Sequence, residues 1–239
     1  MINAKKSLSQ NFLIDKNISE KIVKQTNLKN KNVLEIGPGY GFLTDSILIE
    51  EPKRIILVEK DTDLKKKLYQ KYKNNKKIEI IGDDVLNFNF SKFKDLIVVS
   101  NLPYNISSKI TLYLFNFNEN INEMIFMMQK EVAQKFNYNL PNMNKYKFLT
   151  RIVSDFTICF DVSPQVFIPK PKVYSTVVKF KFFEKKNNLK KATNFSKIIF
   201  KNVRKKIHNN IKIRINSALE NKRVNQLTID ELLTIYDFF

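Results

Sequence analysis

The sequence predicts an α/β fold: a doubly wound, mostly parallel sheet with an antiparallel edge, followed by a small C-terminal helical domain. Three observations indicate this fold. Apolar runs bounded by turn signals alternate with amphipathic stretches of helical length, the pattern of a parallel sheet covered by helices. Two β-rich stretches then flank a proline-rich segment. The last part of the chain is basic and has helical periodicity.

Five apolar runs are the candidate strands of the parallel part. They show little alternation between apolar and polar residues, which is typical of strands buried on both faces. Charged or amphipathic stretches separate them, for instance residues 61–74, where we expect a helix. The five runs are residues 33–36, 55–58, 78–81, 96–99 and 124–128.

The antiparallel edge is expected from residues 151–160 and 173–183, which are rich in β-branched and aromatic residues. The connection DVSPQVFIPKPK between them holds three prolines, which exclude a helix there. The polar stretch EKKNNLKKATN (184–194) predicts a linker. We therefore expect two domains, a catalytic domain over 1–183 and a basic domain of two or three short helices over 184–239.

Composition limits the classes of function. The 239 residues carry a formal net charge of +19, which favours a polyanionic partner such as nucleic acid, although abundant Lys, Asn, Ile and Phe are also typical of an AT-rich genome. A single cysteine, Cys159, and a single histidine, His208, leave no basis for a disulfide, a metal site or a histidine triad. The C-terminal basic cluster comprises Lys201, Arg204, Lys205, Lys206, Lys212 and Arg214.

No targeting or membrane segment is recognisable in the sequence. There is no apolar run of about 18 residues, and the first residues lack the apolar core of a signal peptide. We therefore expect a cytoplasmic protein with no membrane association, or an organellar one whose targeting segment is not detected.

The segment VLEIGPGYGFLT (33–44) combines a strand, a glycine turn and the start of a helix. Gly37, Gly39 and Gly41 would let the backbone approach a ligand closely at the amino end of the helix. Phe42 stands where a dinucleotide fingerprint requires glycine, which argues against a pyrophosphate cofactor. Glu35 is acidic within an apolar strand and would need partners if buried, so we count it among the cofactor-binding candidates.

Carboxylates follow the next two strands. Glu59 lies at the tip of the second strand, where it could accept hydrogen bonds from ribose hydroxyls. After the third strand, Asp83 or Asp84 could accept from an adenine amine, although a helix cap is an alternative role for them. A glycine turn, a ribose carboxylate and an adenine acceptor describe an adenosyl ligand without phosphates. S-adenosylmethionine fits best.

The fourth strand ends in Asn101, Leu102, Pro103 and Tyr104, within VVSNLPYNISSKI. The Asn101 side-chain oxygen and the Leu102 carbonyl could accept both hydrogens of an adenine amine and direct its lone pair toward a sulfonium methyl group. Pro103 would fix the turn and remove a competing donor, and Tyr104 offers a face for a flipped-out base. The alternative is a proline turn with a packed tyrosine.

Several segments together resemble the small-subunit ribosomal RNA adenine dimethyltransferases, the KsgA/RsmA family. The resemblance runs through nearly the whole chain, including FKNVRKKIHNNI and the terminal LTIDELLTIYDFF. The segments that carry it are QNFLID (10–15), EIGPGYGFLT, VEKD, NLPYNIS, MMQKEVAQKF and FIPKPKVYSTVV.

This resemblance implies a Rossmann-like S-adenosylmethionine-dependent methyltransferase acting as a monomer on 16S rRNA in the immature 30S subunit. The expected reaction is two methyl transfers to each of two adjacent adenosines in the hairpin near the 3′ end, late in subunit maturation. By the same resemblance, Asn11 and Leu13 would contact the cofactor, Asp84 rather than Asp83 would bind its adenine, and Tyr104 with Phe167 would enclose the target base.

The chain departs from the family in places, and other functions stay open. The loop NYNLPNMNKYKF lacks the expected glycine-containing turn, and Val203 and His208 stand at two basic positions of the helical domain. A 23S rRNA adenine methyltransferase of the antibiotic-resistance type is the nearest alternative, and a DNA adenine methyltransferase is a weaker one. A non-catalytic assembly factor that keeps the cofactor pocket is the alternative outside enzymes.

Overall fold

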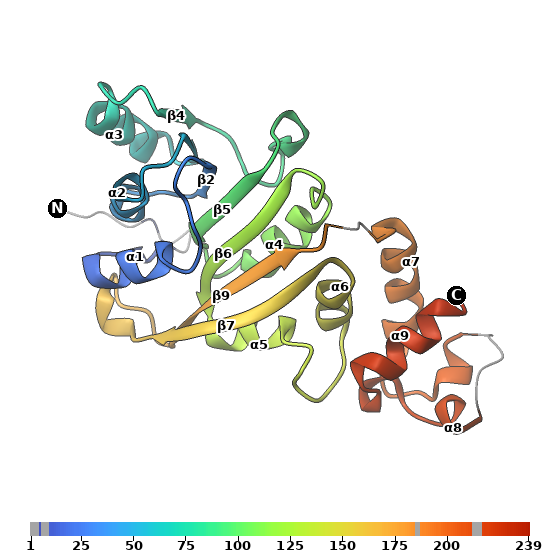
Figure 1. Ribbon diagram of the computed structural model, residues 1–239. Helices are drawn as coiled ribbons and strands as arrows, with labels where there is room; N and C mark the ends of the chain where they lie inside the picture. The colour runs from blue at the N-terminus through green and yellow to red at the C-terminus, as the bar shows by residue number, and fades with distance from the viewer. Residues whose placement is uncertain (1–4, 6–9, 185–186, 212–216) are drawn as a thin grey trace. The chain divides into compact units, whose positions relative to one another are not determined.

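The computed structural model describes residues 5, 10–184, 187–211 and 217–239 (Figure 1). The chain forms two compact units, the first over 1–133 and 157–182 and the second over 134–156 and 183–239. The domain boundary expected at 183/184 therefore differs from the observed division, because residues 134–156 cluster with the C-terminal part of the chain. Within the second unit, the ring of Phe148 lies 5.2 Å from that of Phe195 and 5.3 Å from that of Tyr236.

The described residues form nine strands. Each of the five apolar runs predicted from the sequence is part of a strand, and the fold class is confirmed. The strands are β1 (Phe12–Leu13), β2 (Asn32–Ile36), β3 (Arg54–Val58), β4 (Ile78–Ile81), β5 (Leu96–Asn101), β6 (Ile121–Gln129), β7 (Ser154–Val162), β8 (Phe167–Ile168) and β9 (Ser175–Phe182).

Helices connect these strands and make up much of the second unit. The α-helices of the described residues are α1 (Lys16–Val23), α2 (Phe42–Ile49), α3 (Thr62–Tyr72), α4 (Ser107–Phe115), α5 (Lys130–Phe136), α6 (Lys145–Val153), α7 (Leu189–Ile199), α8 (Ser217–Glu220) and α9 (Ile229–Asp237). Short 3₁₀ turns lie at η2 (Phe90–Lys92), η3 (Pro164–Val166), η4 (Phe200–Asn202), η5 (Ile207–Asn209) and η6 (Val224–Gln226). Among the residues that the structure describes, no helix is long and apolar enough to cross a membrane.

The main sheet has the strand order β4-β3-β2-β5-β6-β9-β7. Neighbouring strands from β4 to β6 are parallel, whereas β9 runs antiparallel to β6, which confirms the antiparallel edge. The order reverses between β2 and β5, because the chain leads from β2 to β3 on one side and only later returns to β5 on the other (Figure 1). Ligands bind at the carboxyl ends of strands at such a switch point.

Helices cover both faces of the sheet. On one face, Ile22 of α1 and Ile47 of α2 pack with strand residues such as Ile97 and Ile125 in one apolar cluster. On the other face lies α4 (Figure 1), whose Phe115 ring is 5.8 Å from that of Phe180. Burial on both faces explains why these strands show no alternation in the sequence.

Three details differ from the sequence-based expectation. Residues 151–153 end helix α6 instead of opening a strand. The predicted linker 184–194 is largely helical, because the Asn188 side chain accepts a hydrogen bond from the Lys191 backbone N–H and so caps α7. The proline-rich connection contains the turn η3, and Pro164 is tolerated there because it stands at the first turn, where its missing N–H is not needed.

In the second unit, a buried lysine organises the loop that lacks the expected glycine turn. Lys147, 3% exposed, donates from Nζ to the carbonyls of Leu140 (2.8 Å), Pro141 and Asn142 (3.2 Å). The ammonium group thus satisfies carbonyls that a tighter turn would satisfy by itself. Of the C-terminal basic cluster, Lys212 and Arg214 lie outside the described residues, and the other four members are exposed.

Candidate active site

A glycine turn after β2 brings the backbone close to a neighbouring segment. Gly37 and Gly39 have φ of +61° and +60°, a conformation that glycine adopts without strain. A Cβ atom on Gly39 would lie 2.8 Å from the Phe12 ring, whereas one on Gly37 would meet no atom within 4 Å. Glycine is therefore needed at 39 for close packing, and at 37 the backbone is open to a ligand.

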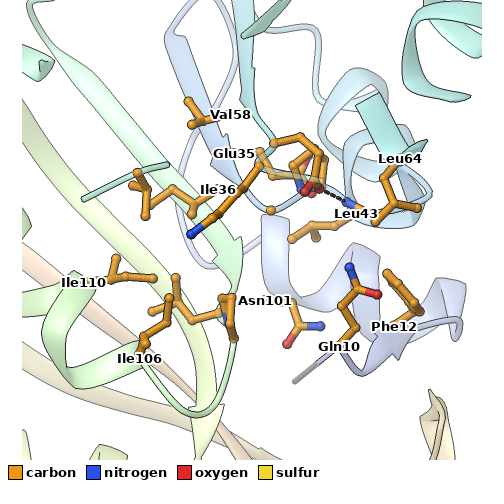
Figure 2. Close-up of a pocket in the computed structure, with 18 of the residues that line it drawn as sticks. Gln10, Phe12, Glu35, Ile36, Leu43, Val58, Leu64, Asn101, Ile106 and Ile110 are labelled. Carbon is orange, nitrogen blue, oxygen red and sulfur yellow. Dashed lines mark hydrogen bonds between the residues drawn. The ribbon is translucent and has the colours of Figure 1, made fainter. Parts of the chain in front are cut away.

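A cavity of about 380 Å³ lies beside this turn, at the carboxyl ends of β2, β3 and β5. Figure 2 shows Asn101, Gln10 and Phe12 on one side of it, with Val58, Glu35 and Leu64 on the other. The switch point of the sheet therefore holds the cavity, as the strand ends predict. The sequence-predicted residues that line it are Asn11, Leu13, Glu35, Gly37, Gly39, Glu59, Asp83, Asp84, Asn101, Leu102, Pro103 and Tyr104.

Phe167 is the one sequence-predicted site residue that the structure does not bring to the cavity wall. Its backbone pairs with Leu13 in the two-stranded β1–β8 sheet, and its side chain is 3% exposed within the apolar core. A base could stack on this ring only if the side chain moved out of the core. Its role at the target base stays a prediction.

Glu59 lies at the end of β3 and is 6% exposed. Its Oε2 accepts a hydrogen bond from the Gly39 backbone N–H at 3.1 Å, and its Oε1 accepts one from the Asp61 N–H at 2.8 Å. Burial raises the pKa of Glu59, and these backbone donors oppose that shift. Each oxygen can accept a further hydrogen bond, so the carboxylate can bind the two hydroxyls of a ribose.

Asp84 follows β4 and pairs with Lys60, whose Nζ is 2.7 Å from Oδ2. This hydrogen bond and one from the Leu86 N–H hold the pKa of Asp84 below its usual range. The Asp83 Oδ1 instead accepts from the Asp84 backbone N–H at 2.7 Å. Asp84 is thus an ionised acceptor in the cavity wall, suited to an adenine amine or a similar donor.

Glu35 is the most buried carboxyl in the cavity wall, at 2% exposure. The Thr44 hydroxyl donates to its Oε2 at 2.6 Å. Burial raises the pKa of Glu35 to about 8, although the hydrogen bond from Thr44 opposes the shift. The expectation that a buried Glu35 needs a partner is met by Thr44, in the first turn of α2.

Asn101 ends β5 and presents a free acceptor. Its Nδ2 donates to the Asn11 carbonyl at 2.9 Å, whereas its Oδ1 is buried and has no hydrogen-bond partner in the described part of the chain. The Leu102 N–H donates to the Met127 carbonyl, and among the described residues the Leu102 carbonyl accepts no hydrogen bond. A buried acceptor without a donor is costly, so Oδ1 is well placed to accept a hydrogen bond from a ligand that enters the cavity.

Tyr104 lines the same cavity and is held by a hydrogen bond. Its hydroxyl shares a hydrogen bond of 2.5 Å with Ser175 Oγ at the start of β9. Burial raises the pKa of Tyr104, and this hydrogen bond opposes the shift. Pro103 precedes it, and the Pro103 carbonyl accepts from the Ile106 N–H at 3.3 Å, which turns the chain toward α4.

Sequence reasoning did not assign several apolar residues that line the cavity, because they carry no signal that separates them from core residues. Phe12, Leu43, Ile106 and Ile110 are the main examples. Lys60, which pairs with Asp84, was also missed, although it stands next to Glu59 in the sequence. Gln10 was recognised only as part of a family segment.

The hydrogen-bond acceptors and the apolar walls of the cavity suit S-adenosylmethionine. The carboxylates of Glu59 and Asp84 match ribose hydroxyls and an adenine amine, and the apolar walls match a purine ring. Gly37 provides open space at the backbone. The unpartnered Oδ1 of Asn101 remains available to accept a hydrogen bond from a second ligand. Phe42, which stands where a dinucleotide fingerprint requires glycine, also lines the wall.

Comparisons with known proteins agree with these observations. Residues 1–239 match the family model described as Ribosomal RNA adenine dimethylase. A protein of Mycoplasmopsis synoviae named Ribosomal RNA small subunit methyltransferase A is 37% identical, in an alignment covering 99% of this chain and 97% of that protein. A protein of the same name from Pelagibacter ubique is 41% identical, with coverage of 86% and 81%.

Two solved structures share the fold. The 23S rRNA methyltransferase ErmE has a TM-score of 0.80 at 21% identity, covering 95% of this chain and 98% of that one. A dimethyladenosine transferase from Plasmodium falciparum has a TM-score of 0.77 at 21% identity, covering 95% and 100%. These likenesses establish the Rossmann-like architecture.

Proposed function

The chain belongs to the ribosomal RNA adenine dimethylase family, and we propose that it methylates two adjacent adenosines near the 3′ end of 16S rRNA. Each adenosine would receive two methyl groups on N6 from S-adenosylmethionine, with the immature 30S subunit as substrate. The enzyme would act in the cytoplasm as a monomer.

The observation that carries this proposal is the unpartnered Oδ1 of Asn101. An adenine N6 amine offers two N–H donors, and Oδ1 together with the Leu102 carbonyl supplies two acceptors at adjacent residues. Accepting both hydrogens withdraws the nitrogen lone pair from conjugation with the ring and directs it outward. Asn101 is thus suited to an amine, whereas a group that only accepts hydrogen bonds would leave Oδ1 unsatisfied.

We assign the remaining residues by the same chemistry. Glu59 would hold the ribose of the cofactor and Asp84 its adenine. Asn11 and Leu13 would border its methionine part. When bound, the cofactor supplies an electrophilic methyl group on a sulfonium. Tyr104 would stack on the target base, held in place by Ser175.

Orientation carries the catalysis in this scheme. The side chain of Asn101 is held by the Asn11 carbonyl, so the acceptor for the amine is positioned before the substrate arrives, and little reorganisation is needed during transfer. The amine needs no base before it attacks. The surplus proton on N6 would pass to solvent after methyl transfer, with S-adenosylhomocysteine as the other product.

The net charge of +19 suits a large RNA substrate. The similarity to ErmE concerns the fold alone, so it does not favour 23S rRNA. The relatives that are 37% and 41% identical carry a small-subunit name, which supports 16S rRNA over the alternative.

The experiment is incubation with radiolabelled S-adenosylmethionine and undermethylated 30S subunits, with protein-free 23S rRNA in parallel. We expect dimethyladenosine in the 3′-end hairpin of 16S rRNA. Label only in 23S rRNA would support the resistance-type alternative. Binding to the particle without any transfer would support a non-catalytic assembly factor.

A further inference from the structure

Asp61 is a buried carboxylate next to the cavity but outside its wall. Its side chain is 2% exposed and accepts hydrogen bonds from Lys5 Nζ at 2.8 Å and Gln10 Nε2 at 3.2 Å. It also accepts from the backbone N–H groups of Asp63 and Leu64, which caps α3. Four donors on one carboxylate are more than a helix cap requires.

Asp61 stays ionised in this setting. Burial works to raise the pKa of its carboxyl, but the hydrogen bonds from Lys5, the Asp63 backbone and Gln10 outweigh burial and place the pKa below its usual range. The negative charge is therefore available to hold the two side chains that come from the N-terminal segment.

The backbone N–H of Asp61 faces Glu59, the carboxylate that we assign to the ribose of the cofactor. Its N–H donates to Glu59 Oε1 at 2.8 Å, so one residue contacts both the ribose-binding carboxylate and the N-terminal segment. Residues 10–13 of that segment all line the cavity. Lys5 and Gln10 are also joined to each other, because the Lys5 N–H donates to Gln10 Oε1 at 2.8 Å.

The same segment reaches the opposite corner of the cavity. One residue after Gln10, the Asn11 carbonyl accepts from Asn101 Nδ2, and Leu13 is then fixed by its pairing with Phe167. A shift of Gln10 would therefore move the carbonyl that orients the amide of Asn101. Two consecutive residues therefore connect both parts of the proposed site. Gln10 bonds to Asp61, which in turn bonds to Glu59, and the Asn11 carbonyl bonds to Asn101.

We propose that Asp61 is a positioning residue: through Gln10 and Lys5 it sets the position of residues 10–13, and so couples cofactor binding at Glu59 to the orientation of Asn101. The expected change in kcat rests on the proposed function. The expected change in the Kd for S-adenosylmethionine requires only that the cavity binds this cofactor.

Asp61→Asn is the informative variant, because asparagine keeps an oxygen that can cap α3 but loses the charge that holds Lys5. Asp63→Asn is the matched control, since Asp63 Oδ2 also binds Lys5, at 2.8 Å, but within the described part of the chain its side chain makes no hydrogen bond to Gln10 or Glu59. We expect Asp61→Asn to raise the Kd for S-adenosylmethionine about tenfold and to lower kcat about tenfold, as for loss of a charge-assisted hydrogen bond. Asp63→Asn should change both by less than about twofold.

A double-mutant cycle of Asp61→Asn and Gln10→Ala distinguishes a positioning role of Asp61 from a general contribution to the stability of the fold. If Asp61 acts through Gln10, the double variant should bind the cofactor no more weakly than Asp61→Asn alone. Wild-type Kd and kcat in Asp61→Asn, or strictly additive effects in the cycle, would overturn the proposal. Calorimetric titration with S-adenosylmethionine uses no RNA, so a failure of the proposed rRNA activity would leave this result interpretable.

Discussion

The amide of Asn101 is held in one orientation by the backbone of Asn11. Nδ2 donates to the Asn11 carbonyl at 2.9 Å, and Oδ1 is left buried without a partner in the described residues. A carbonyl accepts but cannot donate, so this contact also fixes which end of the amide faces the cavity. The acceptor that we propose for the adenine amine is thereby oriented by a residue 90 positions earlier in the chain.

Asn101→Ala should abolish measurable methyl transfer, a loss of at least about 10²-fold, because the acceptor for the amine disappears. Cofactor binding should change little, and binding to the 30S particle should stay close to wild type. Single-turnover methylation and filter binding measure the two effects separately. Retained methylation with lost particle binding would contradict the role assigned to this residue.

The two glycines of the turn should respond differently to alanine. Gly39→Ala forces a Cβ to within 2.8 Å of the Phe12 ring, so the protein without cofactor should lose stability by steric conflict as well as backbone strain. Gly37→Ala meets no protein atom and should lose only about 1 kcal/mol from strain, yet its new methyl group would occupy the space left for the cofactor.

Thermal unfolding with and without S-adenosylmethionine distinguishes these cases. We expect the cofactor to raise the Tm of the wild type by mass action and to leave that of Gly37→Ala almost unchanged. A normal cofactor-induced shift in Gly37→Ala would show that the open space at this position is not part of the binding site.

These residues also show what the sequence can predict. Glu59, Asp84 and Asn101 each follow an apolar strand, and parallel strands bring their carboxyl ends to one edge, so their meeting in one cavity could be anticipated from strand order alone. The orientation of Asn101 could not, because it depends on a backbone carbonyl, and backbone contacts leave no signature in residue type.

Other features escaped prediction for related reasons. Phe12 and Ile106 line the cavity, but an apolar residue beside a ligand has the same sequence pattern as one in the core. Nothing in the sequence marks Lys147 as a buried residue, because its burial depends on three carbonyls of its own loop. The grouping of residues 134–156 with the C-terminal unit depends on aromatic packing by Phe148.

Tyr104 should act through its ring more than through its hydroxyl. Tyr104→Phe loses the hydrogen bond to Ser175 but keeps the stacking face, so we expect the KM for the RNA substrate to rise by less than about fivefold. Tyr104→Ala should raise it by about ten- to a hundredfold, the range for loss of one base–aromatic stack. Steady-state methylation of 30S subunits measures both, and equal effects in the two variants would argue against stacking.

Glu35 should make the free energy of unfolding depend on pH. Its pKa is about 8 in the fold and about 4.3 in an unfolded chain, so between these values the folded protein keeps a proton that the unfolded chain has lost. Stability therefore falls as pH rises through this window, by up to ~1.4 kcal/mol per pH unit. Glu35 makes its full contribution to the free energy of unfolding only below about pH 4.3, the pKa of the unfolded chain.

Glu35→Gln removes this titration while keeping an oxygen that can accept from the Thr44 hydroxyl. Near pH 4.5, where Glu35 is neutral, the variant and the wild type should have similar stability. As pH rises to 8 the variant should become progressively the more stable of the two, because other titrating groups such as Glu59 contribute to both proteins alike. Urea unfolding without cofactor at pH 5, 6, 7 and 8 measures the difference, and parallel pH profiles would mean that Glu35 is already ionised in the fold.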